Sequence, residues 1–268
     1  MKIIYVLPTT NCNLHCPHCD IRTKEDNFDE KMFYKALKEN DGNELVMFGG
    51  EPTLYRSRLK KSLNIASFTS ISTNLLNLDD ELIRLYKHYD LSIATSWNLN
   101  RFDNNQYNIW INHLNLLSEN ELNCIIMITM TEDLVEYNID KFIDMLSQWD
   151  NIKSIKEIKF EYLIDNNSKN DLHLKCDEWL CRLDDNWNFH FTNFIKENLN
   201  NWNYYCNNVY TLLPNGKMIK GCPHNANITF ADECLDCQLV NICKPCRLQS
   251  RCSFPKKLYE KVKQCKNY

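Results

Sequence analysis

The chain has 268 residues, a formal net charge of −4 and a sequence pI near 6.0. Hydrophobic residues make up 44% of it and charged residues 25%, which is typical of a folded globular protein and argues against disorder. The acidic balance, without a block of basic residues, argues against nucleic-acid binding. The apolar runs at 3–7 and 124–130 are too short for a signal sequence or a membrane-spanning helix, so we expect a soluble, cytoplasmic protein.

Alternating strand and helix patterns occupy residues 1–165. Apolar, β-rich runs predict strands at 3–7, 45–48, 68–72, 91–94, 124–130 and 155–164. Amphipathic or polar stretches predict helices at 29–39, 79–89, 105–117 and 138–149. Strands that alternate with helices form a parallel sheet through crossover connections. The expected fold is therefore α/β, a partial (β/α)6 TIM-like barrel with its chemistry at the carboxyl ends of the strands.

The pattern changes in the last hundred residues. A polar stretch at 165–168 leads into a helical bridge, which we place at 166–186. From 187 the segments are short and rich in aromatic residues, and the turn Pro214-Asn215-Gly216 predicts a β-hairpin between 209–213 and 217–219. Beyond the hairpin, we expect closely spaced cysteines, in place of an apolar core, to hold the segment together. We therefore expect a small Cys-rich C-terminal domain at 187–268.

Fourteen cysteines are the most unusual feature of the composition. Disulfides do not persist in a reducing cytoplasm, so clustered cysteines indicate metal binding or catalysis. Cys12, Cys16 and Cys19 lie together after the first strand, and eight more lie near the C-terminus: Cys206, Cys222, Cys234, Cys237, Cys243, Cys246, Cys252 and Cys265. These eleven match one three-ligand and two four-ligand sites. Three thiolates on one loop suit an iron–sulfur cluster with one iron left open, whereas a structural zinc would want a fourth ligand.

Small and polar residues follow the next three predicted strands. Gly49-Gly50-Glu51-Pro52 comes directly after the second strand, where glycine lets the backbone approach a ligand and the carboxylate can pair with a cation. Ser72-Thr73-Asn74 ends the third strand and Ser96 ends the fourth. The alternative for these polar residues is that they cap strand ends and form turns.

The sequence CNLHCPHC, from Cys12 to Cys19, closely resembles the CxxxCxxC motif of radical S-adenosylmethionine (SAM) enzymes, and residues 49–52 resemble the GGEP motif of that family. The resemblance implies that a [4Fe–4S] cluster on Cys12, Cys16 and Cys19 binds SAM through its open iron and cleaves it reductively to a 5′-deoxyadenosyl radical. It also implies roles in holding SAM. Gly49, Gly50, Glu51 and Pro52 would hold the SAM ammonium, Ser72, Asn74 and Ser96 would contact its ribose and carboxylate, and His18 would lie near its adenine in place of a common aromatic residue.

The C-terminal cysteines are similar to the SPASM extension of radical SAM enzymes, which binds two auxiliary [4Fe–4S] clusters. The resemblance assigns Cys234, Cys237, Cys243 and Cys265 to the distal cluster, and Cys206, Cys222 and Cys246 to the nearer one, with Cys252 as its fourth ligand. The spacing departs from the family pattern, because five residues instead of four separate Gly216 from Cys222. A second, overlapping CxxCx5C at Cys243, Cys246 and Cys252 leaves swaps between the clusters, or an open iron on the nearer one, as alternatives. A pair of zinc sites is another.

Three cysteines remain outside these groups, and we expect Cys124, Cys176 and Cys181 to be small buried hydrophobic residues. The alternative for Cys124, on the fifth strand, is a thiol that faces the barrel and donates a hydrogen atom to a substrate radical, as an epimerase requires.

The SPASM resemblance implies that the substrate is a peptide or protein. The expected reaction is a crosslink, oxidation or epimerisation, as in the maturation of ribosomally made peptides (RiPPs), with an electron donor such as flavodoxin or ferredoxin. The first cysteine lies at residue 12, which leaves no room for a preceding leader-binding domain. A separate protein then binds the leader, recognition is by the core peptide, or the substrate is not a leader peptide. The alternatives are radical oxidation or coupling of a small molecule, and a non-catalytic iron–sulfur or zinc scaffold.

Overall fold

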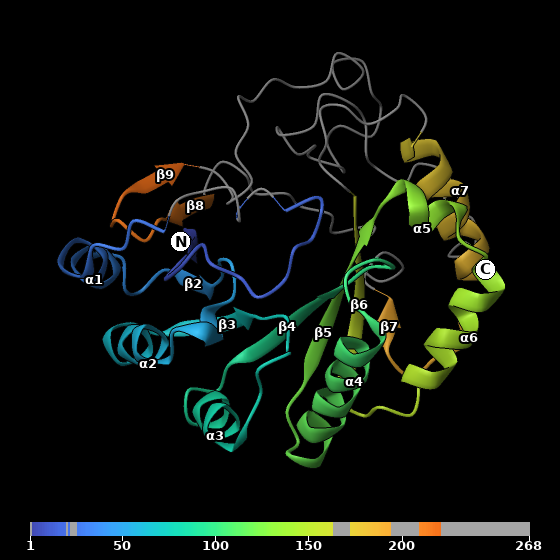
Figure 1. The fold of residues 1–268 in the computed structure, drawn as a ribbon, viewed down its shortest axis with the longest axis horizontal. Helices are drawn as coiled ribbons and strands as arrows, with labels where there is room; N and C mark the ends of the chain where they lie inside the picture. Colours follow the sequence, from blue (N-terminus) through green and yellow to red (C-terminus); the bar gives the residue numbers. More distant parts are fainter. Residues whose placement is uncertain (1, 20, 22–25, 163–171, 194–208, 221–268) are drawn as a thin grey trace, which may run out of the picture. The chain divides into compact units, whose positions relative to one another are not determined.

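The computed structural model describes residues 2–19, 21, 26–162, 172–193 and 209–220. Strands and helices alternate through most of this range (Figure 1). In chain order they are β1 (Ile3–Val6), α1 (Glu30–Glu39), β2 (Glu44–Met47), the 3-10 helix η2 (Pro52–Leu54), α2 (Arg56–Ile65), β3 (Phe68–Ser72), α3 (Asp80–His88), β4 (Ser92–Trp97), α4 (Asn104–Glu119), β5 (Cys124–Met130), α5 (Glu132–Glu136), α6 (Ile139–Trp149), β6 (Ile155–Tyr162), α7 (Leu172–Asp185), β7 (Thr192–Asn193), β8 (Val209–Leu212) and β9 (Met218–Lys220). All six predicted strands and all four predicted helices are confirmed.

The strands form a mostly parallel sheet in the order β7-β6-β5-β4-β3-β2-β1-β8-β9. Strand β1 pairs in parallel with β2, β2 with β3 and β3 with β4. The sheet of the described residues ends at β7 and β9 and does not close, as expected for a partial barrel. Because β1 to β4 run in the same direction, the loops that follow them share one edge of the sheet.

A first compact unit holds β1 to α4 and the β8–β9 hairpin. Helices α1, α2 and α3 lie along the same face of the sheet (Figure 1). Burial alternates along the strands, and Ile4, Val6, Leu45 and Met47 are among the buried residues. The helices begin where side chains cap them: Asp29 accepts from the amide of Met32 at α1, and Asp103 and Gln106 form a capping box at α4.

The predicted hairpin is confirmed, but its place in the fold was not foreseen. Strands β8 and β9 pair antiparallel around the Pro214-Asn215-Gly216 turn. Strand β8 also pairs in parallel with β1, with Ile3 opposite Val209 and Val6 opposite Leu212. The hairpin, expected in the Cys-rich domain, thus completes the edge of the main sheet beside the first strand.

A second compact unit contains most of β5 together with α5, α6, β6, α7 and β7. Its core is aromatic: the ring centroids of Trp97 and Trp149 lie 5.5 Å apart, and those of Phe142 and Trp179 lie 4.9 Å apart. Helix α7 confirms the helix expected in the bridge. Strand β7 pairs in parallel with β6 and was not predicted, because two residues carry no periodic signal.

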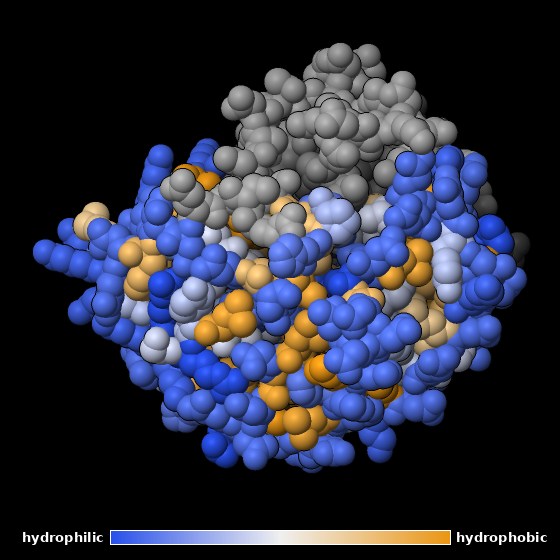
Figure 2. Space-filling model, in the orientation of Figure 1, coloured by the Kyte–Doolittle hydropathy of each residue, from blue (hydrophilic) through white to orange (hydrophobic). Residues whose placement is uncertain are grey.

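The described surface shows few large apolar side chains. Only Met32, Leu54 and Tyr137 are both large and exposed among the described residues. The described part of the face drawn in Figure 2 is mostly hydrophilic, with hydrophobic residues (orange) showing between hydrophilic ones (blue). None of the described helices combines the length and apolar character that crossing a bilayer requires.

Candidate functional site

The three N-terminal cysteines lie on the loop that follows β1. Cys12, Cys16 and Cys19 are free thiols and are half-buried. The amide of Leu14 donates to the sulfur of Cys12 at 3.4 Å, and the amide of Cys19 donates to the carbonyl of Cys16 at 3.2 Å. Burial raises the pKa of the Cys12 thiol, and the amide of Leu14 acts in the opposite direction. The loop is therefore held by its own backbone, with its sulfur atoms partly shielded from water.

Gly49 and Gly50 hold this loop against the end of β2. The amide of Gly50 donates to the carbonyl of Thr9 at 3.0 Å, and the amide of Glu51 donates to the carbonyl of Asn11 at 2.7 Å. A Cβ atom on Gly50 would lie 2.1 Å from the oxygen of Asn11, and one on Gly49 would lie 2.5 Å from that of Thr9. The sequence predicted that these glycines let a ligand approach the backbone closely. The structure shows that they let the backbone of the cysteine loop approach the end of β2.

Glu51 is fully buried and joins the ends of β2 and β3. One carboxylate oxygen accepts from the amide and hydroxyl of Thr53, at 3.1 and 2.6 Å, and from the hydroxyl of Thr73 at 2.8 Å. The other accepts from the amide of Asn74 at 2.6 Å. A buried carboxylate is tolerated only when it is hydrogen-bonded in this way. The side chain therefore orders two strand ends, a role that the motif alone did not indicate, and Pro52 starts η2 directly after it.

Asn74 connects the end of β3 to the cysteine loop. Its amide nitrogen donates to the side-chain oxygen of Asn13 at 2.6 Å and lies 3.9 Å from the sulfur of Cys12. The following residue, Leu75, has a left-handed backbone with φ of 58°, and its carbonyl lies 2.5 Å from Nδ1 of His113. The structure thus brings together Cys12, Glu51 and Asn74, which the sequence had placed in separate motifs.

Three other predicted SAM contacts lie near this edge of the sheet. Ser72 ends β3, and Ser96 lies one residue before the end of β4; both are half-buried. His18 is half-buried beside Cys19. Among the described residues, no hydrogen bond joins Ser72 or Ser96 to the cysteine loop.

Cys124 lies away from this edge, at the start of β5. It is fully buried, and burial raises the pKa of its thiol. It lies close enough to Tyr86 of α3 to contribute to the raised pKa of that phenol, of which burial is the main cause. This placement favours the packing role over hydrogen-atom donation. Cys176 is likewise buried and Cys181 half-buried, both on α7.

A cluster around Arg58 holds the cysteine loop from α2 and was missed in the sequence. The guanidinium donates to the carbonyl of Pro8 at 3.0 Å and to the carboxylate of Asp26 at 3.2 Å, and it lies 3.8 Å from the ring centroid of Phe28. Asp26 in turn accepts from the amide of Thr10 at 3.1 Å and the side chain of Asn11 at 3.2 Å. No spacing rule identifies these residues, because they are single positions far apart in the chain.

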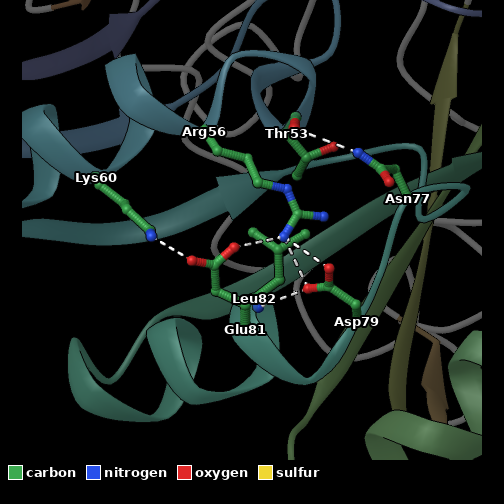
Figure 3. Close-up of polar contacts among 7 residues, drawn as sticks. All are labelled: Thr53, Arg56, Lys60, Asn77, Asp79, Glu81 and Leu82. Carbon is green, nitrogen blue, oxygen red and sulfur yellow. Dashed lines mark hydrogen bonds and ion pairs between the residues drawn. The ribbon is translucent and has the colours of Figure 1, made fainter.

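A second polar network joins α2 to the start of α3 (Figure 3). Arg56 pairs with Asp79 at 2.8 Å and with Glu81 at 3.0 Å, and Lys60 also pairs with Glu81. Asn77 donates to the carbonyl of Thr53 at 3.3 Å. A hydrogen bond from Arg56 lowers the pKa of Asp79, which also caps α3. This network fixes the segment that carries the GGEP residues to the start of α3.

The donor set of the loop fits an iron–sulfur cluster. Within the described ranges, no three His, Cys, Asp or Glu side chains converge on a point that would suit a single metal ion. In a cubane cluster each thiolate binds a different iron, so the cysteines surround the cluster and need not meet at one point. Three free, half-buried thiols on one loop match this requirement. The eight C-terminal cysteines, 206, 222, 234, 237, 243, 246, 252 and 265, lie outside the described residues.

Solved structures with the same fold contain SAM or a peptide. The chain superposes on a histidine-tagged anSMEcpe with bound AdoMet with a TM-score of 0.72 at 13% identity, covering 99% of this chain and 97% of that one. A native anSMEcpe with bound AdoMet and Kp18Cys peptide gives 0.72 at 13% identity, covering 98% and 97%. Streptococcus suis SuiB bound to precursor peptide SuiA gives 0.62 at 16% identity, covering 92% and 72%. At these identities the likeness shows the fold, and it confirms the partial barrel.

Sequence comparison identifies the family. An uncharacterized protein of Archaeoglobus fulgidus is 28% identical over 115 residues, which are 40% of this chain and 28% of that protein. The chain therefore spans less than a third of that relative's length. The family model of the Radical SAM superfamily matches residues 6–146, which include the cysteine loop, the Gly49–Pro52 segment, Asn74 and Ser96. The chain belongs to the radical SAM superfamily.

Proposed function

We propose that the chain uses a [4Fe–4S] cluster on Cys12, Cys16 and Cys19 to cleave SAM reductively and modifies a peptide or protein with the resulting radical. The observation that carries the proposal is the convergence of the cysteine loop on the ends of β2 and β3, through Gly50, Glu51 and Asn74. When bound, the cluster and SAM supply a 5′-deoxyadenosyl radical that removes a hydrogen atom from the substrate. The protein positions these groups.

Different residues at the strand ends would hold different parts of SAM. Gly49 and Gly50 fix the loop, and the segment from Gly49 to Pro52 would hold the SAM ammonium. Asn74, already beside the sulfur of Cys12, would contact the SAM ribose or carboxylate together with Ser72 and Ser96. His18, next to Cys19 on the loop, would lie near the adenine. Each assignment rests on the family resemblance, from which His18 departs because an aromatic residue is common at its position.

A peptide or protein is the proposed substrate. Two proteins of the same fold, anSMEcpe and SuiB, have been solved with peptides bound, and the superpositions cover more than nine-tenths of this chain. The eight C-terminal cysteines support a SPASM-like domain with two auxiliary [4Fe–4S] clusters, and the overlapping spacings leave the ligand assignment open. A cytoplasmic flavodoxin or ferredoxin would supply the electron, and a separate protein would bind a leader peptide.

SAM cleavage is tested directly with the reconstituted protein. Full-length chain loaded anaerobically with iron and sulfide, then given dithionite and SAM, is expected to release 5′-deoxyadenosine, because Cys12, Cys16 and Cys19 would hold a cluster that supplies the electron for SAM cleavage. Cys16→Ala is expected to abolish this release, and Cys181→Ala, a cysteine outside all three proposed clusters, is the matched control. A protein that carries the N-terminal cluster and releases no nucleoside would contradict the proposed activity.

The substrate class is tested with a peptide. A short peptide encoded beside the gene, co-expressed with the enzyme, is expected to change in mass, and the change should be absent with Cys16→Ala. An unchanged peptide, together with SAM cleavage that a small-molecule extract stimulates, would favour the small-molecule alternative.

A further inference from the structure

Arg101 reaches the cysteine loop from the segment that follows β4. One guanidinium nitrogen, Nη1, donates to the sulfur of Cys16 at 3.5 Å. Its positive charge also acts on Cys12, where it opposes the effect of burial on the pKa of that thiol. Arg101 thus donates directly to one of the three cysteines that the family motif assigns to the cluster. Neither the motif nor the spacing of the sequence points to it.

The surroundings of Arg101 differ from those of the other arginines near the site. Arg56 and Arg58 both form ion pairs with carboxylates, at 2.8 and 3.2 Å. Among the described residues, no carboxylate pairs with Arg101, and its Nε is buried without a hydrogen-bond partner. The ring centroid of Phe102 lies 5.5 Å from the guanidinium carbon and supports it from one side. Placing a half-buried cation without an anion is costly, so a negative partner on the cysteine loop would account for this position.

We propose that Arg101 tunes the N-terminal cluster, by donating an N–H···S hydrogen bond to Cys16 that stabilises the reduced state. Reduction adds one electron from the external donor, and the cluster with its thiolates becomes more negative by one charge. A cation and a hydrogen bond at a ligand sulfur favour the more negative state, so they raise the reduction potential. Arg101 is then a positioning residue that makes the cluster easier to reduce. This inference rests on the proposed cluster at Cys12, Cys16 and Cys19.

The fork of the guanidinium explains why an arginine occupies this position. One nitrogen reaches Cys16 while Nε stays buried in the protein. A lysine would keep the charge as a single point on a flexible stem and would direct its hydrogen bond less well. Arg101→Lys should therefore keep part of the effect, and Arg101→Gln should lose most of it.

The test is a redox titration of the full-length, anaerobically reconstituted chain, followed by electron paramagnetic resonance. The signal that disappears in a Cys12→Ala, Cys16→Ala, Cys19→Ala variant belongs to the N-terminal cluster, which separates it from any C-terminal cluster. We expect its midpoint potential to move to more negative values in Arg101→Gln and to a lesser extent in Arg101→Lys. Arg84→Gln, which removes an exposed arginine of α3, should leave it unchanged.

The outcomes separate this inference from the proposed function. If the triple cysteine variant has the same signals as wild type, the cluster is not on this loop. Both the proposed function and the role of Arg101 are then wrong. If the signal is present and Arg101→Gln titrates at the wild-type potential, the tuning role is wrong, and weakened SAM binding in the same variant would instead make Arg101 an anchor for the SAM carboxylate. A midpoint potential does not depend on the loaded fraction, so incomplete loading does not obscure it. If Arg101→Gln does not load at all, a wild-type potential in Arg101→Lys contradicts the inference.

Discussion

Single residues at the carboxyl edge of the sheet act on the cysteine loop through the backbone as much as through side chains. Gly50 and Glu51 donate backbone hydrogen bonds to Thr9 and Asn11, just before Cys12. The Glu51 side chain, with no exposed surface, receives its hydrogen bonds from Thr53, Thr73 and Asn74. The GGEP residues of this chain therefore hold the cysteine loop in place through their own hydrogen bonds, in addition to any contact with a ligand. A change of shape within the motif should disturb the cysteine loop first.

The close approach at Gly50 leads to a prediction about cluster loading. Gly50→Ala adds a Cβ that would lie 2.1 Å from the Asn11 oxygen, so the loop must move away from β2. We expect a loss of roughly half or more of the N-terminal cluster, since an N–H···O contact displaced in this way no longer holds the loop. The measurement is the N-terminal cluster signal per chain after reconstitution.

Gly42→Ala is the matched control for this prediction. Gly42 has φ of +90°, and a Cβ there would meet nothing within 4 Å. Alanine at this position should cost about 1 kcal/mol of stability through backbone strain and leave cluster loading unchanged. Equal loading of both variants would show that the contact between Gly50 and the loop is dispensable.

At the scale of elements, the Arg56 network fixes η2 and α2 to the start of α3. Asp79 has two roles there, since it caps α3 through the amide of Leu82 and pairs with Arg56. Asparagine caps helices about as well as aspartate does, so Asp79→Asn isolates the ion pair. The Asp79 side chain is 53% exposed, so we expect the substitution to cost less than about 1 kcal/mol at pH 7.

The pH dependence of that cost has a definite sign. The hydrogen bond from Arg56 lowers the pKa of Asp79 below its ordinary value of 3.8, so the folded state favours the charged form. The stabilisation is complete above that ordinary value and is lost as the pH falls through the lowered pKa of the folded state. Urea unfolding of wild type and Asp79→Asn should differ at pH 7 and converge near pH 2. A constant difference across this range would show that the effect does not depend on the ionised Asp79 carboxylate.

The same scale shows which elements a sequence reveals. Strand β5 and helix α6 were predicted within a residue or so because their apolar periodicity is strong over seven and eleven residues. Helix α2 was missed because only Leu59, Ser62 and Leu63 of its ten residues are buried, which leaves a weak apolar stripe. Pairing between β8 and β1 could not be predicted, because it joins segments some two hundred residues apart and leaves no local pattern.

At the scale of the whole chain, the site is assembled from many separate segments. The motif residues Cys12, Gly50, Glu51 and Asn74 were found in the sequence because the family fixes their types and spacing. Asp26, Arg58 and Arg101 were not found as site residues, because each is a single common residue type whose role depends on three-dimensional contacts. The assignments of Ser72, Ser96, His18 and the C-terminal cysteines stay predictions.

The C-terminal cysteines allow a prediction about the chain as a whole. Gly50, Glu51, Arg58, Asn74 and Arg101, which hydrogen-bond to the N-terminal cysteine loop, all lie before residue 102. A variant with all eight C-terminal cysteines changed to Ala should therefore lose both auxiliary clusters and keep the N-terminal one. Its iron content should fall from about twelve to about four per chain, because each cubane holds four irons.

This variant should keep one of the two proposed activities and lose the other. SAM cleavage with dithionite should continue, since it needs only the loop cluster and the strand ends that hold SAM. Peptide modification should be lost, because the auxiliary clusters are expected to bind the substrate or accept an electron from it. Changing Cys176 and Cys181 of α7 to Ala is the control for removing thiols outside the clusters. If wild-type protein contains about four irons and also bound zinc, the C-terminal cysteines form zinc sites and not auxiliary clusters. If the variant loses SAM cleavage, the N-terminal site depends on the C-terminal region.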